Sequence, residues 1–124
     1  MIESFRDLRV WKLGMDLAEM IHKQTEAFPR HELYGLANQL RRAAVSIPSN
    51  VAEGHTREST KEYLQAISIA RSSLAEVETQ CELAVRFGYL KAAQFEEVKE
   101  IVVPLGKQLA SLRNALERKL ERRP

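Results

Sequence analysis

The sequence predicts an all-α protein that folds as an antiparallel up-down-up-down four-helix bundle. The chain is rich in Ala, Leu, Glu, Arg and Lys, which favour helices. Apolar residues recur at spacings of three and four in four segments, and only short breaks separate them. Helices joined by such short connections pack antiparallel to their neighbours. With 124 residues, 44% hydrophobic and 29% charged, we expect one domain over residues 1–124, with a frayed basic end at about 118–124.

The first predicted helix, residues 7–27, is apolar around most of its circumference. Its polar positions form one narrow stripe with spacings of 4, 3, 4 and 3: Lys12, Asp16, Glu19, Lys23 and Glu26. A helix packed on one side only shows a narrower apolar face. We therefore expect this helix to be covered on two sides, with Trp11 buried. Phe28 ends it, because a residue before proline avoids the α region.

The second predicted helix, residues 31–54, contains a proline. Its apolar face comprises Leu33, Leu36, Ala37, Leu40, Ala43, Ala44, Ile47 and Val51. Pro48 removes one backbone donor and predicts a kink or a restart near that residue. Gly54 is a natural C-terminal stop.

The third and fourth predicted helices carry long apolar seams. Ser59 and Glu62 match a capping box at the start of the third helix. Its seam then alternates spacings of four and three: Tyr63, Ile67, Ala70, Leu74, Val77, Cys81, Ala84 and Gly88. The fourth helix starts near Lys91 and continues a similar seam through Phe95, Val98, Val102, Leu105, Leu109, Leu112, Leu116 and Leu120. Pro104 and Gly106 predict a bend in its middle.

The sequence gives little support for an enzyme. Its histidines, His22, His31 and His55, are scattered and form no metal-binding or catalytic pattern. Cys81 lies on the apolar seam, where an inert buried thiol is expected. We therefore expect no catalytic residues, no cofactor and no metal. A single cysteine forms no internal disulfide, and we see neither a signal peptide nor an apolar run of membrane-spanning length, so a cytoplasmic protein without membrane contact is expected.

Positive charge is uneven although the formal net charge is only +2. Residues 107–124 hold six basic and two acidic residues, a net charge of +4. This end either binds phosphate or simply opposes the negative end of the helix dipole. The adjacent Arg41 and Arg42 likewise belong either to an anion site or to an internal polar network around Pro48. The candidate nucleic-acid-binding residues are Arg41, Arg42, Arg57, Lys107, Arg113, Arg118, Lys119, Arg122 and Arg123.

Several motifs resemble one bacterial family, the four-helix bundle proteins encoded in intervening sequences of 23S ribosomal RNA genes. The chain reads FRDLRVW at 5–11, ELYGL at 32–36, QLRRAAVSIPSNVAEG at 39–54, LAEVETQ at 74–80 and GYL at 88–90. The resemblance covers nearly the whole chain, and only the basic C-terminal end falls outside it. It implies an up-down bundle that assembles into a homopentamer, with no catalytic residues, and a family whose function is unknown.

The leading functional expectation is a non-enzymatic homo-oligomer that binds structured RNA or DNA through basic surfaces. Repetition around a ring multiplies a small charge per subunit, and several weak sites on one body bind by avidity. The alternative is a protein-interaction scaffold in which the arginines of residues 41–57 are internal. Burial of Arg41 and Arg42, paired with Glu53 or Glu76, would favour that alternative.

Overall fold

The computed structural model describes residues 2–122, and the regular secondary structure within this range is entirely helical. The four α-helices are α1 (Arg9–Thr25), α2 (Leu36–Thr56), α3 (Thr60–Arg86) and α4 (Ala92–Glu121), and two short 3-10 helices, η1 (Phe5–Asp7) and η2 (Arg30–Glu32), precede α1 and α2. The predicted all-α fold with four helices is confirmed. In the described part of the chain, no helix is both long and apolar enough to cross a membrane.

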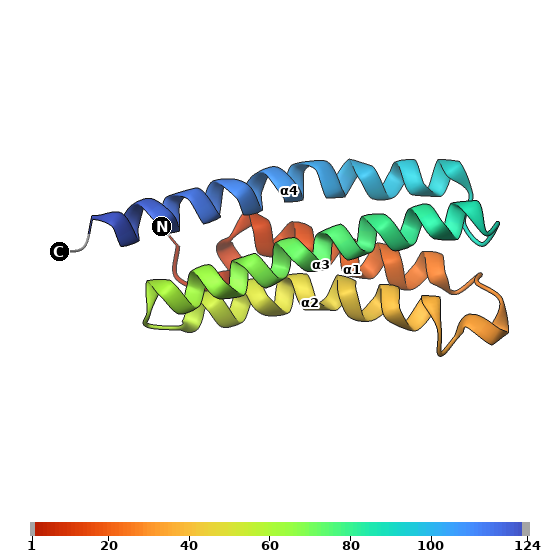
Figure 1. Cartoon of the computed structure of the whole chain (residues 1–124), viewed down its shortest axis with the longest axis horizontal. Coiled ribbons are helices and arrows are strands. Elements are labelled where there is room, and N and C mark those ends of the chain that lie inside the picture. Colours follow the sequence, from red (N-terminus) through yellow and green to blue (C-terminus); the bar gives the residue numbers. More distant parts are fainter. Residues whose placement is uncertain (1, 123–124) are drawn as a thin grey trace.

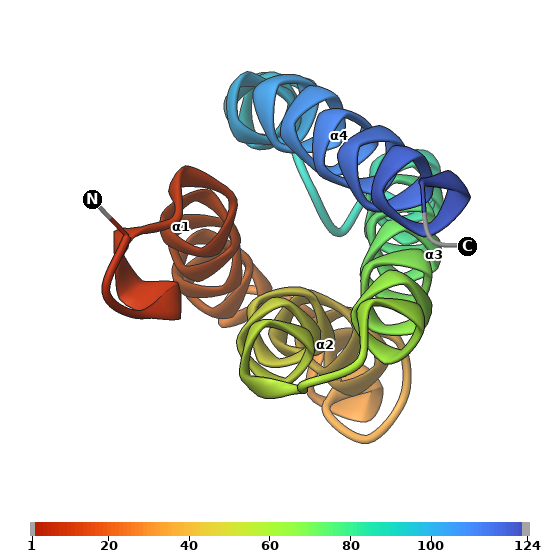
Figure 2. The same ribbon diagram turned by 90° about the vertical axis from the view of Figure 1, so that its left-hand side faces the viewer.

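The helices lie side by side along one long axis, and the chain reverses direction from each helix to the next (Figure 1). α1 contacts α2, α2 contacts α3, α3 contacts α4, and α4 returns to contact α1. Viewed along the axis, the helices surround a shared interior (Figure 2). The C-terminal turns of α4 reach beyond the ends of α2 and α3 (Figure 1). This last feature leaves a stretch of α4 with fewer neighbours than the rest of the bundle.

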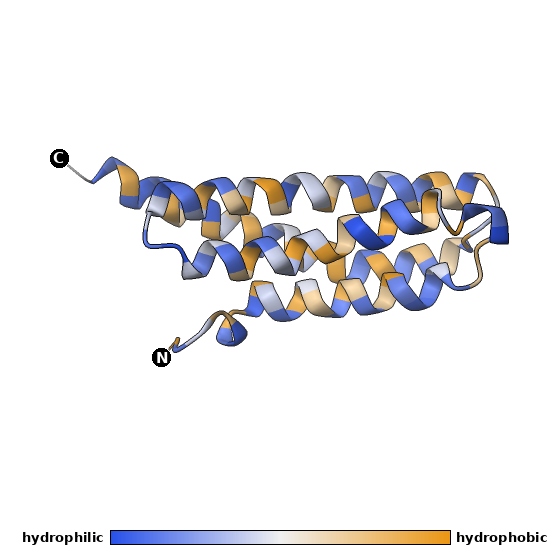
Figure 3. Ribbon diagram, turned by 90° about the horizontal axis from the view of Figure 1, so that it is seen from below, coloured by the Kyte–Doolittle hydropathy of each residue, from blue (hydrophilic) through white to orange (hydrophobic). Residues whose placement is uncertain are grey.

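The core follows the predicted seams. Hydrophobic and hydrophilic residues interleave along every helix, so each helix has an apolar side to bury (Figure 3). The buried residues of α3 include Ile67, Ala70, Leu74, Val77, Cys81 and Ala84, and those of α4 are Val98, Val102, Leu105, Leu109 and Leu116. At about 25 cal/mol per Å² of apolar surface, this continuous burial is the main stabilising contribution.

At the start of α3 only one of the two hydrogen bonds of the predicted capping box is present, and Gly88 follows the end of the helix as predicted. The Ser59 side-chain oxygen accepts a hydrogen bond from the Glu62 backbone N–H at 3.3 Å, which satisfies one free donor of the first turn. After α3, Gly88 adopts a φ of +81°, a left-handed conformation that costs glycine little and other residues more. These two positions fix the length of α3.

The predicted limits of α2 are wrong at both ends. The Glu32 carboxylate accepts a hydrogen bond from the Leu36 backbone N–H at 3.1 Å, so α2 begins at Leu36, after the separate turn η2. Leu33 precedes the helix and is 47% exposed instead of lying on its apolar face. At the other end, α2 passes through Gly54 and ends at Thr56.

Gly54 is a packing residue and not a helix stop. A Cβ atom at this position would lie 2.8 Å from Cδ1 of Tyr63 and 2.9 Å from Cβ of Ala66, closer than carbon atoms approach. The missing side chain therefore lets α2 approach α3. Pro48 also lies inside α2, and the helix continues through it without restarting. The kink expected at Pro48 stays a prediction, as does the bend expected at Pro104.

Candidate nucleic-acid interface

Arg41 is part of the joint between α1 and α2. Its Nε donates a hydrogen bond to the Thr25 hydroxyl at 2.7 Å, and its Nη2 donates to the His22 backbone carbonyl at 3.2 Å. His22 and Thr25 belong to the last turn of α1, whose carbonyl groups lack helical partners and carry partial negative charge. The half-buried guanidinium therefore caps α1, which is a structural role.

Arg42 follows directly and points elsewhere. It is exposed and lines a polar depression between α2 and α3 together with Gln39, Ser46, Ser73 and Glu76. Within residues 2–122, no acidic residue pairs with it at ion-pair distance. Successive residues project about 100° apart around a helix, which explains how adjacent arginines serve different surfaces. Arg42 is thus free to bind an external anion.

A polar network forms near Pro48 beside this depression, but neither Arg41 nor Arg42 belongs to it. Asn50 Nδ2 donates to the Ser46 backbone carbonyl at 2.8 Å and to the Ser46 hydroxyl at 3.0 Å. The buried Ser73 hydroxyl donates to the Ser46 hydroxyl at 2.9 Å and links α3 to α2. This part of the motif serves the helix packing.

Arg57 lies at the far end of α2 and is already paired with two carboxylates. Its guanidinium nitrogens lie 3.7 Å from a Glu53 oxygen and 3.6 Å from a Glu62 oxygen. All three side chains are more than half exposed, so each ion pair contributes little to stability. A phosphate group would have to compete with both carboxylates for this arginine.

The basic residues at the end of α4 are the least engaged. Lys107, Arg118, Lys119 and Arg122 are exposed, and none forms an ion pair with another described residue. Arg113 is half-buried, with Nε 3.8 Å from a Glu117 oxygen and Nη2 donating to the Asn114 side chain at 3.3 Å. Arg123 lies outside the described residues. This end of α4 is therefore the main group of free cations among the candidates.

Three of these cations share one side of α4. At 100° per residue, Lys107, Arg118 and Arg122 fall within about 60° of one another. They project away from Leu109 and Leu116, which are buried in the core. The same outward side carries Glu96 and Glu100 in the first half of the helix and Glu121 near its end, so the outer surface of α4 changes from acidic to net basic along its length.

The candidate residues do not converge on one site. Arg42 lies on α2 and Arg57 directly follows its last residue, fifteen positions later, which corresponds to about 22 Å along the helix axis. The C-terminal ends of α2 and α4 lie at the same end of the bundle (Figure 1), but α2 and α4 do not contact each other in the described chain. The structure thus places Arg42 alone on one side face and Arg118, Lys119 and Arg122 together at one end, with Lys107 about 16 Å before them along α4.

Two further surfaces are formed by residues that lie far apart in the chain, so their positions cannot be predicted from the sequence. A depression of about 360 Å³ lies between α1 and α2 and is lined by Trp11, Met15, Ala18, Val45, Pro48, Ser49 and Ala52. Trp11 is only partly buried, with its ring 5.5 Å from that of Phe5, and Met15 and Val45 are 45% and 54% exposed. A second groove lies between α1 and α4. The apolar pattern of α1 gave the only signal for the first surface.

Neither an activated nucleophile nor a cluster of metal ligands is seen among the described residues. Burial raises the pKa of the Cys81 thiol to about 12, with the Glu78 charge as a smaller cause, so the thiolate needed for nucleophilic attack is not formed near neutral pH. Residues 2–122 contain no group of three or more His, Cys, Asp or Glu side chains that could hold a metal ion.

Comparisons with known proteins agree with this fold. The family model of the 23S rRNA-intervening sequence protein matches residues 6–111. A crystal structure of a protein of unknown function from the S23 ribosomal protein family of Bacteroides thetaiotaomicron is similar at a TM-score of 0.75 and 22% identity, covering 84% of this chain and 97% of that one. No curated protein matches the sequence. The family match stops before Arg113 but spans most of the chain. The chain therefore belongs to the 23S rRNA-intervening sequence protein family.

Proposed function

We propose that the chain is a non-enzymatic homo-oligomer that binds structured RNA or DNA through the basic end of α4. The observation that carries the proposal is the set of exposed, unpaired cations on α4: Lys107, Arg118, Lys119 and Arg122. Lysine and arginine at such positions neutralise phosphates and release counterions, which provides affinity without base recognition. Arg42 is a second, separate phosphate contact.

The outer face between α1 and α2 supports the oligomeric part of the proposal. Trp11, Met15 and Val45 remain partly or largely exposed there, around an apolar depression. Apolar surface that is left open in one subunit marks a contact site for another. A second copy of the chain would cover the second apolar side of α1.

Assembly would amplify a small charge. Each chain carries +2, and the pentamer implied by the family resemblance carries about +10. Repeated weak contacts on one rigid body then act at high effective concentration. The proposal places the protein in the cytoplasm, where the unpaired Cys81 thiol stays reduced.

A titration with a structured ribosomal RNA fragment tests the proposal. The test variant changes Arg118, Lys119 and Arg122 to Ala, and the control variant changes Lys12, Lys61 and Arg71, which are exposed elsewhere, to Ala. Both variants lose the same charge. We expect at least about tenfold weaker binding for the test variant and a smaller change for the control. Equal losses would show that only net charge matters, and the assigned site would be wrong.

The alternative function is a protein-interaction scaffold without a nucleic-acid role. The capping role of Arg41 favours it, because one of the two arginines of the motif is used internally. Absence of saturable RNA and DNA binding at physiological salt would support this alternative.

A further inference from the structure

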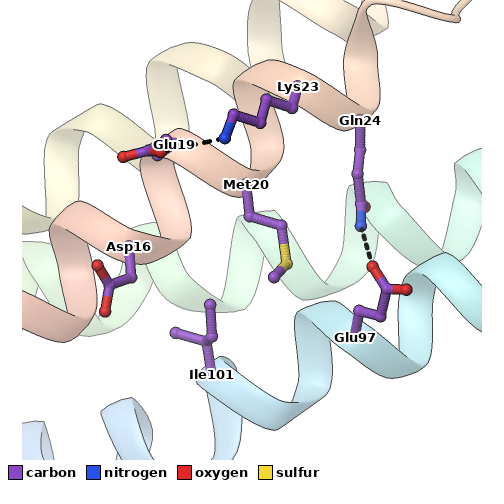
Figure 4. A pocket seen from close by; sticks show the side chains of 7 residues that line it. All are labelled: Asp16, Glu19, Met20, Lys23, Gln24, Glu97 and Ile101. Carbon is purple, nitrogen blue, oxygen red and sulfur yellow. Dashed lines mark hydrogen bonds and ion pairs between the residues drawn. The ribbon is translucent and has the colours of Figure 1, made fainter.

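The groove between α1 and α4 has an apolar floor. It encloses about 430 Å³ and is lined by Asp16, Glu19, Met20, Lys23, Gln24, Glu97 and Ile101 (Figure 4). Met20 of α1 and Ile101 of α4 meet across it, and both remain partly exposed. Partly exposed apolar side chains that face one another offer a continuous strip on which another apolar surface can pack.

The rim of the groove is acidic. Asp16 on α1 and Glu97 on α4 form no ion pair with any cation of residues 2–122. Glu19 is neutralised by Lys23, whose Nζ lies 3.2 Å from the Glu19 carboxylate. Two carboxylates on opposite walls are therefore left without a counter-charge, and they favour a cationic occupant over an anionic one.

Gln24 of α1 connects the two walls of the groove by hydrogen bonds to α4. Its amide nitrogen donates to the Gln94 backbone carbonyl at 3.2 Å and to the Glu97 carboxylate at 3.4 Å, which fixes the orientation of the amide. The amide oxygen is consequently buried and accepts no hydrogen bond from the described residues.

We propose that this groove docks a basic amphipathic helix of a partner protein. The apolar residues of that helix lie on Met20 and Ile101, and its Lys or Arg side chains reach Asp16 and Glu97. An apolar strip between two helices is the usual receptor for an amphipathic helix, and the charges on the rim select its sign. The same carboxylates repel nucleic acid, so this surface acts independently of the basic end of α4.

The direct test uses an 18-residue peptide of Leu and Lys with Leu at helical spacings i, i+3, i+4 and i+7. Its binding to the full chain is followed by fluorescence anisotropy at low and at physiological salt. The double variant Asp16→Lys/Glu97→Lys should bind at least about tenfold more weakly, because two attractive charges become repulsive. A peptide with Glu in place of Lys should not bind.

The matched control is Glu58→Lys/Glu78→Lys, which makes the same change in net charge at exposed positions away from the groove. It should keep most of the affinity for the Leu/Lys peptide. No saturable binding to the unmodified chain, or equal losses in both double variants, would overturn the proposal. RNA titrations of the same proteins keep this outcome separate from the nucleic-acid function.

A second copy of the chain is the other occupant that the groove could have. Measuring the mass of the protein in solution tests this alternative. We expect Asp16→Lys/Glu97→Lys to leave the assembly unchanged, because we assign the subunit contact to the face between α1 and α2. Dissociation of the assembly in this variant, but not in the control, would mean that the groove is an interface between copies, and the partner-helix proposal would be wrong.

Discussion

The helix α2 and the last turns of α4 both contain clustered positive charge, yet the two regions use it differently. In α2, Arg41 caps α1 and Arg57 pairs with two carboxylates, so that mainly Arg42 stays free. At the end of α4, Arg118 and its neighbouring cations face solvent without ion-pair partners among the described residues.

The difference follows from what surrounds each helix. Both α1 and α3 pack on α2, so its polar side chains meet backbone carbonyls and carboxylates of neighbouring helices. The last turns of α4 extend past those neighbours (Figure 1) and lie beyond residues 6–111, which the family model matches. The polar residues of a motif such as residues 39–54 can therefore serve helix packing. The charged residues of a helix end with few neighbours can stay free to bind a ligand.

The largest expected effect on stability is at Gly54 in α2, and a substitution of Gly106 in α4 is the matching comparison. Gly54→Val in α2 should destabilise the protein by about 3 kcal/mol, because the new Cβ overlaps Tyr63 and Ala66. Gly106→Ala in α4 should be neutral or slightly stabilising, because its Cβ meets only Leu74 at 3.6 Å and alanine favours helix. Thermal and urea unfolding measure both. A Gly54→Val protein of native stability would refute the close packing of α2 on α3.

A somewhat smaller effect is expected at Arg41. Arg41→Ala should cost on the order of 2 kcal/mol, because the Thr25 hydroxyl and the His22 carbonyl lose a charged donor at the end of α1. RNA affinity per folded molecule should stay unchanged. Urea unfolding together with RNA titration measures the two effects separately. If the Arg41→Ala variant binds RNA more weakly and its stability is unchanged, Arg41 is an RNA-binding residue and not a cap of α1.

The acid sensitivity of the start of α2 is a weaker effect. The Leu36 backbone N–H, followed by the Tyr89 hydroxyl, lowers the pKa of Glu32 below its usual 4.5. Because the folded-state pKa is lowered, the stabilisation is present above pH 4.5 and disappears as the pH falls through the lowered value. Glu32→Gln should remove this part of the pH dependence. The check is the melting temperature of both proteins between pH 7 and pH 3. If the two melting temperatures fall by the same amount as the pH is lowered, Glu32 does not have this role.

The smallest effect on stability is expected at Arg42. Arg42→Ala should change the free energy of unfolding by no more than about 0.5 kcal/mol, because no described residue forms an ion pair with its guanidinium. It should weaken RNA binding less than removal of three α4 cations does. Comparing this variant with Arg41→Ala sharpens the contrast between the two adjacent arginines. A large loss of stability at Arg42 would erase that contrast.

The helices and their seams could be predicted because they depend on local spacing. Cys81 and Val98, for example, are buried where the three-and-four repeat places them. The limits of α2 could not, because Glu32 caps it from a separate turn and Gly54 is selected by contact with Tyr63 on another helix. Such contacts join residues that no local pattern relates.

The candidate site was less predictable than the fold. The positions of the cations are visible in the sequence, but whether an arginine meets Thr25 or solvent depends on the packing of α1 against α2. The groove between α1 and α4 joins Asp16 and Glu97, which are 81 positions apart in the chain. Only the folded bundle brings these two carboxylates onto the same groove.

Binding of RNA by the end of α4 is tested most directly by the salt dependence of RNA affinity. We would compare the unmodified chain with the triple variant in which Arg118, Lys119 and Arg122 are changed to Ala. We predict saturable binding at physiological salt and a steep decrease in affinity as salt rises, with a slope that falls by about 1 for each phosphate contact the variant loses. Identical affinities and slopes for the two proteins would contradict this prediction.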